Sequence, residues 1–132
     1  MNNRLGYIIA ATIVVGVLVF GVAVIFQQNA NSSKAPCTTV DGKRHDFVIR
    51  NSTVTPTDLT AQRCDTLTIT NQDNISRTIA FGNHDHHVAY GGIEERELTK
   101  DQALTVTLDQ VGEFHFHDHL HDEVEGYFTV EK

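Results

Sequence analysis

The feature that most constrains the fold of this chain is a series of short segments in which apolar and polar residues alternate. The alternation is clearest in Thr66-Leu-Thr-Ile-Thr70 and in Ala103-Leu-Thr-Val-Thr-Leu108. A period of two places every second side chain on the same face of a β-strand, so both segments predict strands with one buried face. No segment shows the 3.6-residue period of an amphipathic helix.

Similar segments recur along the rest of the chain and are separated by turn residues such as Asn71-Gln-Asp-Asn74. The other expected strands are residues 45–50, 77–81, 113–117 and 127–130. About seven short strands, each with one buried face, predict an antiparallel β-sandwich. The charged segment from Gly91 to Asp101 is expected to form a loop or a short helical turn.

The first residues form a separate unit. Leu5 to Phe26 contains no charged residue, and about 20 apolar residues suffice for a helix to cross a bilayer. We therefore expect residues 5–26 to be a transmembrane anchor, with residues 1–4 inside, because Arg4 is positive, and the rest of the chain on the extracytoplasmic side, in the periplasm or at the cell surface. The alternative is a cleaved signal peptide, for which Ser33-Lys-Ala35 is an acceptable cleavage site.

Residues 27–35 are small and polar and are expected to form a linker, and residues 36–132 suit one domain with one core. All 17 acidic residues lie in that domain, with eight of the ten basic ones. This excess of negative charge argues against a nucleic-acid partner and favours cations near the surface.

The two cysteines of the chain, Cys37 and Cys64, both lie in the domain that we expect outside the cytoplasm. Oxidation is permitted there, so a disulfide between them is the leading interpretation. A pair of copper thiolates is the alternative.

Seven of the eight histidines fall in two short stretches, residues 82–88 and 114–121. Imidazole is the commonest metal ligand in proteins and suits copper and zinc. We therefore predict a metal site, with Cu(II) as the leading ion and Zn(II) as the alternative. The candidate ligands are His84, His86, His87, His115, His117, His119, His121 and Asp118. The remaining histidine, His45, is expected to be solvated.

The order of strands and turns over residues 45–132 resembles the cupredoxins, the small blue-copper β-sandwich proteins. The matching motifs are Thr55-Pro-Thr-Asp-Leu-Thr60, Cys64-Asp-Thr-Leu-Thr-Ile-Thr-Asn-Gln-Asp73, Val111-Gly-Glu-Phe-His-Phe116 and Asp118-x-x-His121-x-x-Val124-x-Gly126. The resemblance implies an all-β, Greek-key sandwich. Cys64 takes the place of a glycine that is usual in the family, which fits a disulfide recruited at that turn.

The resemblance also shows where this chain departs from the family. The four positions that hold the copper ligands His, Cys, His and Met correspond here to Arg77, Asp118, His121 and Val124. Of these four, only His121 keeps the family's ligand. Arginine stays protonated and cannot coordinate a metal, so blue-copper electron transfer is not expected. Asp118 is left with two alternatives, a metal ligand or an ion-pair partner of Arg77.

The family also implies where the histidines lie. Strand 77–81 should pair antiparallel with strand 113–118, which brings the turn after residue 81 near His115 and His117, so that His84, His86 or His87 could approach these two histidines. If Phe114 and Phe116 point into the sandwich, these two histidines point out of it. His119 and His121 could belong to the same site or to a second one with Asp118, Asp122 or Glu123.

Three functions fit these observations. The leading one is a membrane-tethered metal-binding domain for sequestration or delivery of copper or zinc. The second is a histidine-only copper protein for redox chemistry or electron transfer, and the third is a pH-responsive interaction module. Catalytic triads and phosphate-binding loops are absent from the sequence, so no enzyme activity is expected, although copper redox activity is left open.

Overall fold

The structure is a computed structural model, and it describes residues 36–37 and 42–132. The predicted anchor (residues 5–26), the residues before it and the linker lie outside the described residues. Ten strands are found among the described residues: β1 Arg44–Arg50, β2 Thr53–Thr55, β3 Asp58–Gln62, β4 Thr66–Asn71, β5 Arg77–Asn83, β6 His86–His87, β7 Glu95–Leu98, β8 Ala103–Thr107, β9 Gly112–Asp118 and β10 His121–Glu131. Within the same ranges there is no helix of the length and hydropathy that a membrane span needs.

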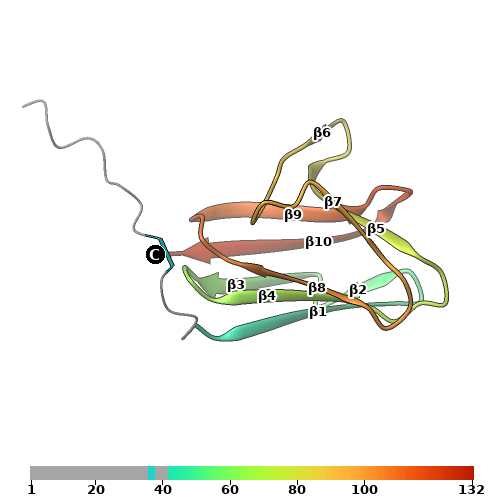
Figure 1. Cartoon of the computed structure of the whole chain (residues 1–132), viewed down its shortest axis with the longest axis horizontal. Coiled ribbons are helices and arrows are strands. Elements are labelled where there is room, and N and C mark those ends of the chain that lie inside the picture. Colours follow the sequence, from blue (N-terminus) through green and yellow to red (C-terminus); the bar gives the residue numbers. More distant parts are fainter. Residues whose placement is uncertain (1–35, 38–41) are drawn as a thin grey trace, which may run out of the picture. The chain divides into compact units, whose positions relative to one another are not determined.

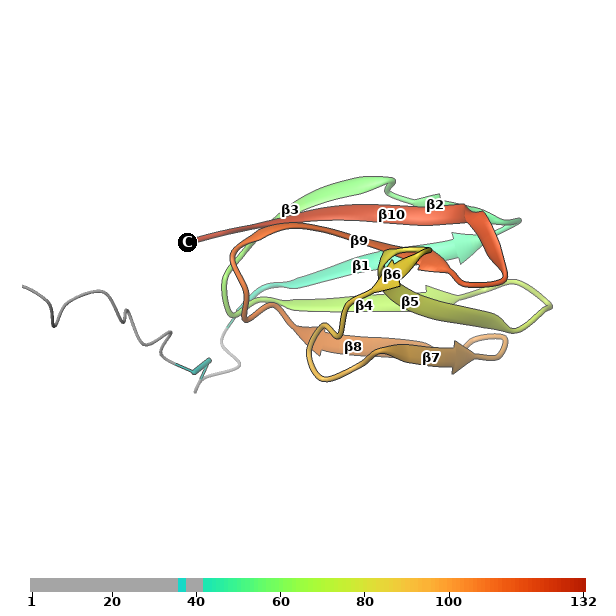
Figure 2. The ribbon, with the colours of Figure 1, turned by 90° about the horizontal axis from the view of Figure 1, so that it is seen from above.

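The strands form two layers, as Figures 1 and 2 show from two directions. One sheet has the order β2-β1-β4-β8, and the other has the order β3-β10-β9-β5-β6, with β7 paired to β5. Aromatic and branched side chains fill the space between them. Phe47 of the first sheet meets Phe116 of the second, with ring centroids 5.0 Å apart. The predicted all-β sandwich is therefore confirmed.

The alternation in the sequence explains which side chains fill this core. In β8, Leu104 and Val106 are buried, whereas Ala103 and Thr105, which alternate with them, are exposed. Each buried leucine or phenylalanine contributes about 1.5–3 kcal/mol relative to an exposed one, so this pattern fixes which face of the strand turns inward.

Two details of the predicted fold were wrong. Two strand pairs are parallel, β1 with β4 and β3 with β10, so the sandwich is not purely antiparallel. The segment from Gly91 to Asp101 contains strand β7, which pairs with β5. Its sequence, Glu-Arg-Glu-Leu, has only one buried residue, Leu98, so a search for apolar alternation does not find it.

A disulfide joins Cys37 to Cys64, as the leading interpretation of the cysteines predicted. The adjacent Asp65 accepts hydrogen bonds from the backbone N–H groups of Lys43 (2.7 Å) and Gln62 (2.9 Å). Its other contact is with His45 Nε2, 2.8 Å away. The expectation of a solvated His45 was therefore wrong.

These contacts also set the charge of Asp65. Burial by itself raises the pKa of this carboxyl, but the hydrogen bonds from Gln62, His45 and Lys43 outweigh burial and leave the pKa below its ordinary value. Asp65 is thus a charged anchor between the start of β1 and the turn before β4.

Candidate metal site

The pairing of β5 with β9 determines on which face of the sheet Asp118 and His117 lie. Ile79 lies opposite Asp118, and Ala80 lies opposite His117. The predicted antiparallel pairing of these two segments is confirmed. Because successive side chains of a strand point to opposite faces, Asp118 turns into the sandwich and His117 turns away from it.

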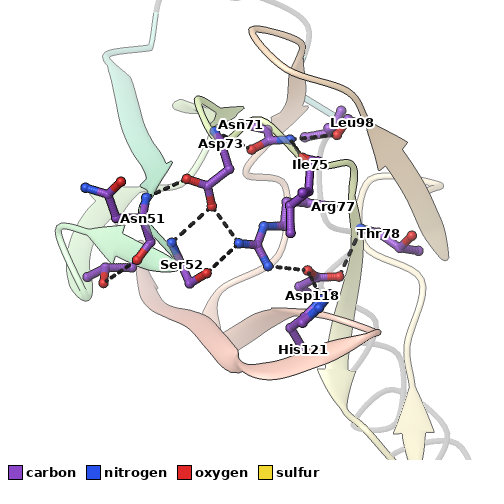
Figure 3. Close-up of polar contacts among 11 residues, drawn as sticks. Asn51, Ser52, Asn71, Asp73, Ile75, Arg77, Thr78, Leu98, Asp118 and His121 are labelled. Atoms are coloured by element: carbon purple, nitrogen blue, oxygen red, sulfur yellow. Dashed lines mark hydrogen bonds and ion pairs between the residues drawn. The ribbon is translucent and has the colours of Figure 1, made fainter.

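On the inner face, Arg77 forms the ion pair that was one of the two alternatives for Asp118 (Figure 3). Arg77 Nη1 lies 3.0 Å from Asp118 Oδ2, and Arg77 Nη2 donates to Asp73 Oδ2 (2.6 Å) and to Ser52 Oγ (2.7 Å). The side chains of Arg77 and Asp118 are fully buried. A guanidinium between two carboxylates therefore occupies this end of the sandwich.

Asp118 has no acceptor capacity left for a metal ion. Oδ1 accepts from the backbone N–H groups of Thr78 (3.0 Å) and Leu120 (3.2 Å), and Oδ2 contacts Arg77 and His121 Nδ1, each at 3.0 Å. Burial raises the pKa of Asp118, but Arg77 and these hydrogen bonds outweigh burial and hold the pKa below its ordinary value.

A blue-copper site of the kind implied by the resemblance does not fit these residues. Such a site needs a cysteine thiolate, and both cysteines of the chain are joined in the disulfide. The position of that thiolate holds Asp118, which is engaged by Arg77, and the position of the methionine holds the buried Val124.

On the outer face, four of the predicted ligands come together: His84, His87, His117 and His119. One ring nitrogen from each lies within 4.8 Å of the other three. Metal–nitrogen bonds of about 2.0–2.1 Å place the nitrogens of a tetrahedral site about 3.3 Å apart. A small inward movement of these rings therefore completes a four-imidazole site. His119 Nδ1 is already 3.2 Å from His87 Nε2.

His117 shows most clearly that the group suits a metal. Its side chain is buried, and neither ring nitrogen makes a hydrogen bond of good geometry. Burial and the neighbouring rings of His115 and His87 lower the pKa of His117, and Asp122 and the Gly82 backbone offset this only in part. A buried imidazole whose ring nitrogens make no hydrogen bond of good geometry is available as a metal ligand.

The turn after β5 brings His84 and His87 over the sheet. Gly82, the second-last residue of β5, has a φ of +87°, a backbone conformation that favours glycine. A Cβ at this position would also lie 2.8 Å from the backbone oxygen of His86. The chain then folds back so that Gly82 pairs with His87, and Figure 1 shows β6 projecting beyond the sheet of β5 and β9.

The other predicted ligands lie elsewhere. His115 Nε2 is 3.0 Å from Glu125 Oε2, and its ring stacks on Tyr127. His86 is exposed on β6. His121 and Asp118 contact each other, as described above. None of these four belongs to the histidine group.

Two carboxylates border the group. Glu95 Oε1 lies 2.9 Å from His87 Nδ1, and Asp122 Oδ1 lies 2.9 Å from His84 Nδ1. Sequence reasoning considered Asp122 only for a second site and overlooked Glu95, because it placed residues 91–101 in a loop. Recognition of β7 as the neighbour of β5 would have found Glu95.

Among solved structures, the chain is similar to a purple cupredoxin from Nitrosopumilus maritimus, with 17% identity and a TM-score of 0.58 over 65% of this chain and 98% of that one. It is also similar to an amicyanin variant in its reduced state, with 22% identity and a TM-score of 0.55 over 71% and 87% of the two chains. The fold is cupredoxin-like.

A second amicyanin variant, in a reduced Cu(I) form, has 21% identity and a TM-score of 0.56 over 76% of this chain and 95% of that one. No protein-family model and no curated protein matches the sequence. At these identities the cupredoxin-like proteins define the fold, and the chemistry of this chain follows from its own residues.

The buried ion pair predicts a strong thermodynamic coupling. Asp118→Leu should lower the free energy of unfolding by about 3–5 kcal/mol, because it leaves Arg77 buried with one carboxylate fewer. Arg77→Leu combined with Asp118→Leu should cost clearly less than the sum of the two single changes. Urea unfolding of the full-length chain measures each value. Additivity of the single changes within about 0.5 kcal/mol would contradict the coupling.

Proposed function

We propose that this chain is a membrane-tethered, extracytoplasmic domain that binds one copper or zinc ion through His84, His87, His117 and His119. The observation that carries the proposal is His117, a buried imidazole without a hydrogen bond of good geometry, surrounded by three other rings. A buried polar group without a partner costs about 1–3 kcal/mol. A bound metal ion removes that penalty and uses the free nitrogen.

Copper is the leading ion for chemical reasons. A site of four imidazoles suits either tetrahedral Zn(II) or tetragonal Cu(II), and the general affinity order of divalent ions places Cu(II) above Zn(II). The similarity in fold to an amicyanin variant in a Cu(I) form adds support.

The role that we propose is metal sequestration or delivery. His84 and His87 come from β6 and the turn before it, and His117 and His119 come from β9 and the residues just after it. One domain therefore supplies all four ligands without a partner, which suits storage. A second candidate is a redox role, favoured by the ring stack from His117 through His115 to Tyr127, with centroid separations of 5.4 and 4.8 Å. Reduction of copper-loaded protein by ascorbate and reoxidation by oxygen would support that candidate, and failure to cycle would remove it.

Metal titration of the full-length chain in detergent tests the site. Isothermal calorimetry with Cu(II), and separately with Zn(II), should show one tightly bound ion per chain. His117→Ala and His87→Ala should each remove tight binding. His86→Ala and His121→Ala serve as matched controls, because neither residue belongs to the group, and both should retain it.

The bound ion should also stabilise the protein. A metal concentration of about 100 times Kd adds about 2.7 kcal/mol to the free energy of unfolding, which thermal unfolding detects as a higher midpoint. Absence of stoichiometric binding at micromolar free metal would refute the proposed function. Equal loss of binding in the His86 and His121 controls would refute the assigned ligands.

The tether is a separate part of the proposal. It rests on the uncharged run of residues 5–26 and on the Cys37–Cys64 disulfide, which suits an oxidising compartment. The expressed full-length chain should sediment with membranes and resist extraction by carbonate, and protease added from the extracytoplasmic side should digest residues 36–132. Recovery of the chain in the soluble fraction, shortened by removal of its first residues, would instead indicate a cleaved signal peptide.

A further inference from the structure

Glu95 reaches the histidine group because of strand register. Ala80 of β5 lies opposite Glu95 of β7 on one side and opposite His117 of β9 on the other. The three residues therefore form a row across the outer face of the sheet. The small side chain of Ala80 leaves room above it, and Glu95 Oε1 approaches His87 Nδ1 (2.9 Å) and His119 Nδ1 (3.5 Å).

The contact with Glu95 favours one orientation of the His87 ring relative to the group. It is an ion-pair contact of 2.9 Å to Nδ1, and a carboxylate, which can only accept, favours the tautomer whose nearer ring nitrogen carries the proton. In that tautomer His87 keeps its lone pair on Nε2, which lies 3.2 Å from His119 Nδ1. His84 has the same arrangement, because its Nδ1 lies 2.9 Å from Asp122 Oδ1.

A carboxylate behind an imidazole acts on the bound ion in two ways. It raises the basicity of the ligating nitrogen, and its negative charge stabilises a more highly charged ion. Four neutral imidazoles supply no charge, so Glu95 and Asp122 together balance a divalent ion. The same site around a monovalent ion retains one excess negative charge.

The two carboxylates differ in the size of their electrostatic effect on the site. The side chains of His84 and Asp122 are 49% and 58% exposed, so water screens that pair. His87 is only 19% exposed, and Glu95 is 43% exposed. Glu95 therefore has the larger effect. Arg96 lines the same surface hollow as His87 and Glu95, and its positive charge partly offsets the negative charge of Glu95. Among the interactions of the described residues, the group's histidines contact Glu95 and not Arg96.

We infer that Glu95 is a positioning residue that makes the four-histidine site hold Cu(II) in preference to Cu(I), with Asp122 in a smaller supporting part. This inference rests on the proposed function and adds the oxidation state of the bound copper. A site with this preference retains oxidised copper and resists its reduction.

The test compares the two oxidation states on the same protein. The dissociation constants for Cu(II) and for Cu(I) are measured by competition with chromogenic chelators, the latter without oxygen, on the full-length chain in detergent. Glu95→Gln should weaken Cu(II) binding by about 10- to 100-fold and Cu(I) binding by no more than a few fold. The readout is the ratio of the Cu(II) dissociation constant to the Cu(I) dissociation constant. Each tenfold increase in this ratio raises the copper reduction potential by about 59 mV.

Three further variants define the cause. Asp122→Asn should shift the ratio in the same direction by less, and Glu95→Asp, which keeps the charge, should return it toward the wild-type value. Glu97→Gln is the matched control, because Glu97 is exposed on the same strand but about 7 Å farther along it, and it should leave the ratio unchanged. The ratio cancels any general loss of folded protein.

The outcomes separate this inference from the proposed function. If wild-type protein binds neither oxidation state, the proposed function fails and the inference fails with it. If wild-type protein binds copper but Glu95→Gln weakens both states equally, the inference alone is overturned. An equal shift of the ratio in Glu97→Gln would also overturn it, because a general change in surface charge would then suffice.

Discussion

The register between β5 and β9 is the constraint on which both sites depend. It places Asp118 opposite Ile79 on the inner face and His117 opposite Ala80 on the outer face. A slip of one residue would exchange the two faces and would bury imidazoles where Arg77 now meets its carboxylates. The packing of Phe81 against the buried core and its pairing with Phe116 oppose such a slip.

The inner end of the sandwich holds a buried charge network around Arg77. Burial of Arg77 is costly unless its guanidinium finds partners. Asp118, Asp73 and Ser52 supply three contacts to the two terminal nitrogens, while Nε has no hydrogen-bond partner among the described residues. Such a pair contributes little net stability, but removal of either partner is strongly destabilising because it leaves a buried charge without its counter-charge. Its practical consequence is that the inner position is occupied by a protein cation, and the metal site that we propose lies on the outer face instead.

Much of this arrangement could be predicted from the sequence. Period-two alternation in Thr66–Thr70 and Ala103–Leu108 identified strands of the core, since apolar burial dictates that pattern. The pairing of residues 77–81 with 113–118, which the resemblance to cupredoxins implied, placed the turn containing His84, His86 and His87 near His115 and His117; of these five residues, the structure groups His84, His87 and His117. The Arg77–Asp118 pair was one of two alternatives that the residues left open.

The remaining features depend on information that alternation does not contain. Strand β7 has one buried residue, so its pairing with β5 and the approach of Glu95 were missed. The choice of His87 over its neighbour His86 depends on the register in which the short strand β6 pairs with β5, which composition does not determine. His45 looked like an isolated surface residue because Asp65, its partner, is twenty positions away.

The most direct test of this account is a crystal structure of the copper-loaded protein, with anomalous diffraction data collected at the copper edge. The account predicts one strong anomalous peak within bonding distance, about 2.0–2.1 Å, of nitrogens from His84, His87, His117 and His119, with the Arg77–Asp118 ion pair intact. A peak between Asp118 and His121, with Arg77 displaced, would contradict it.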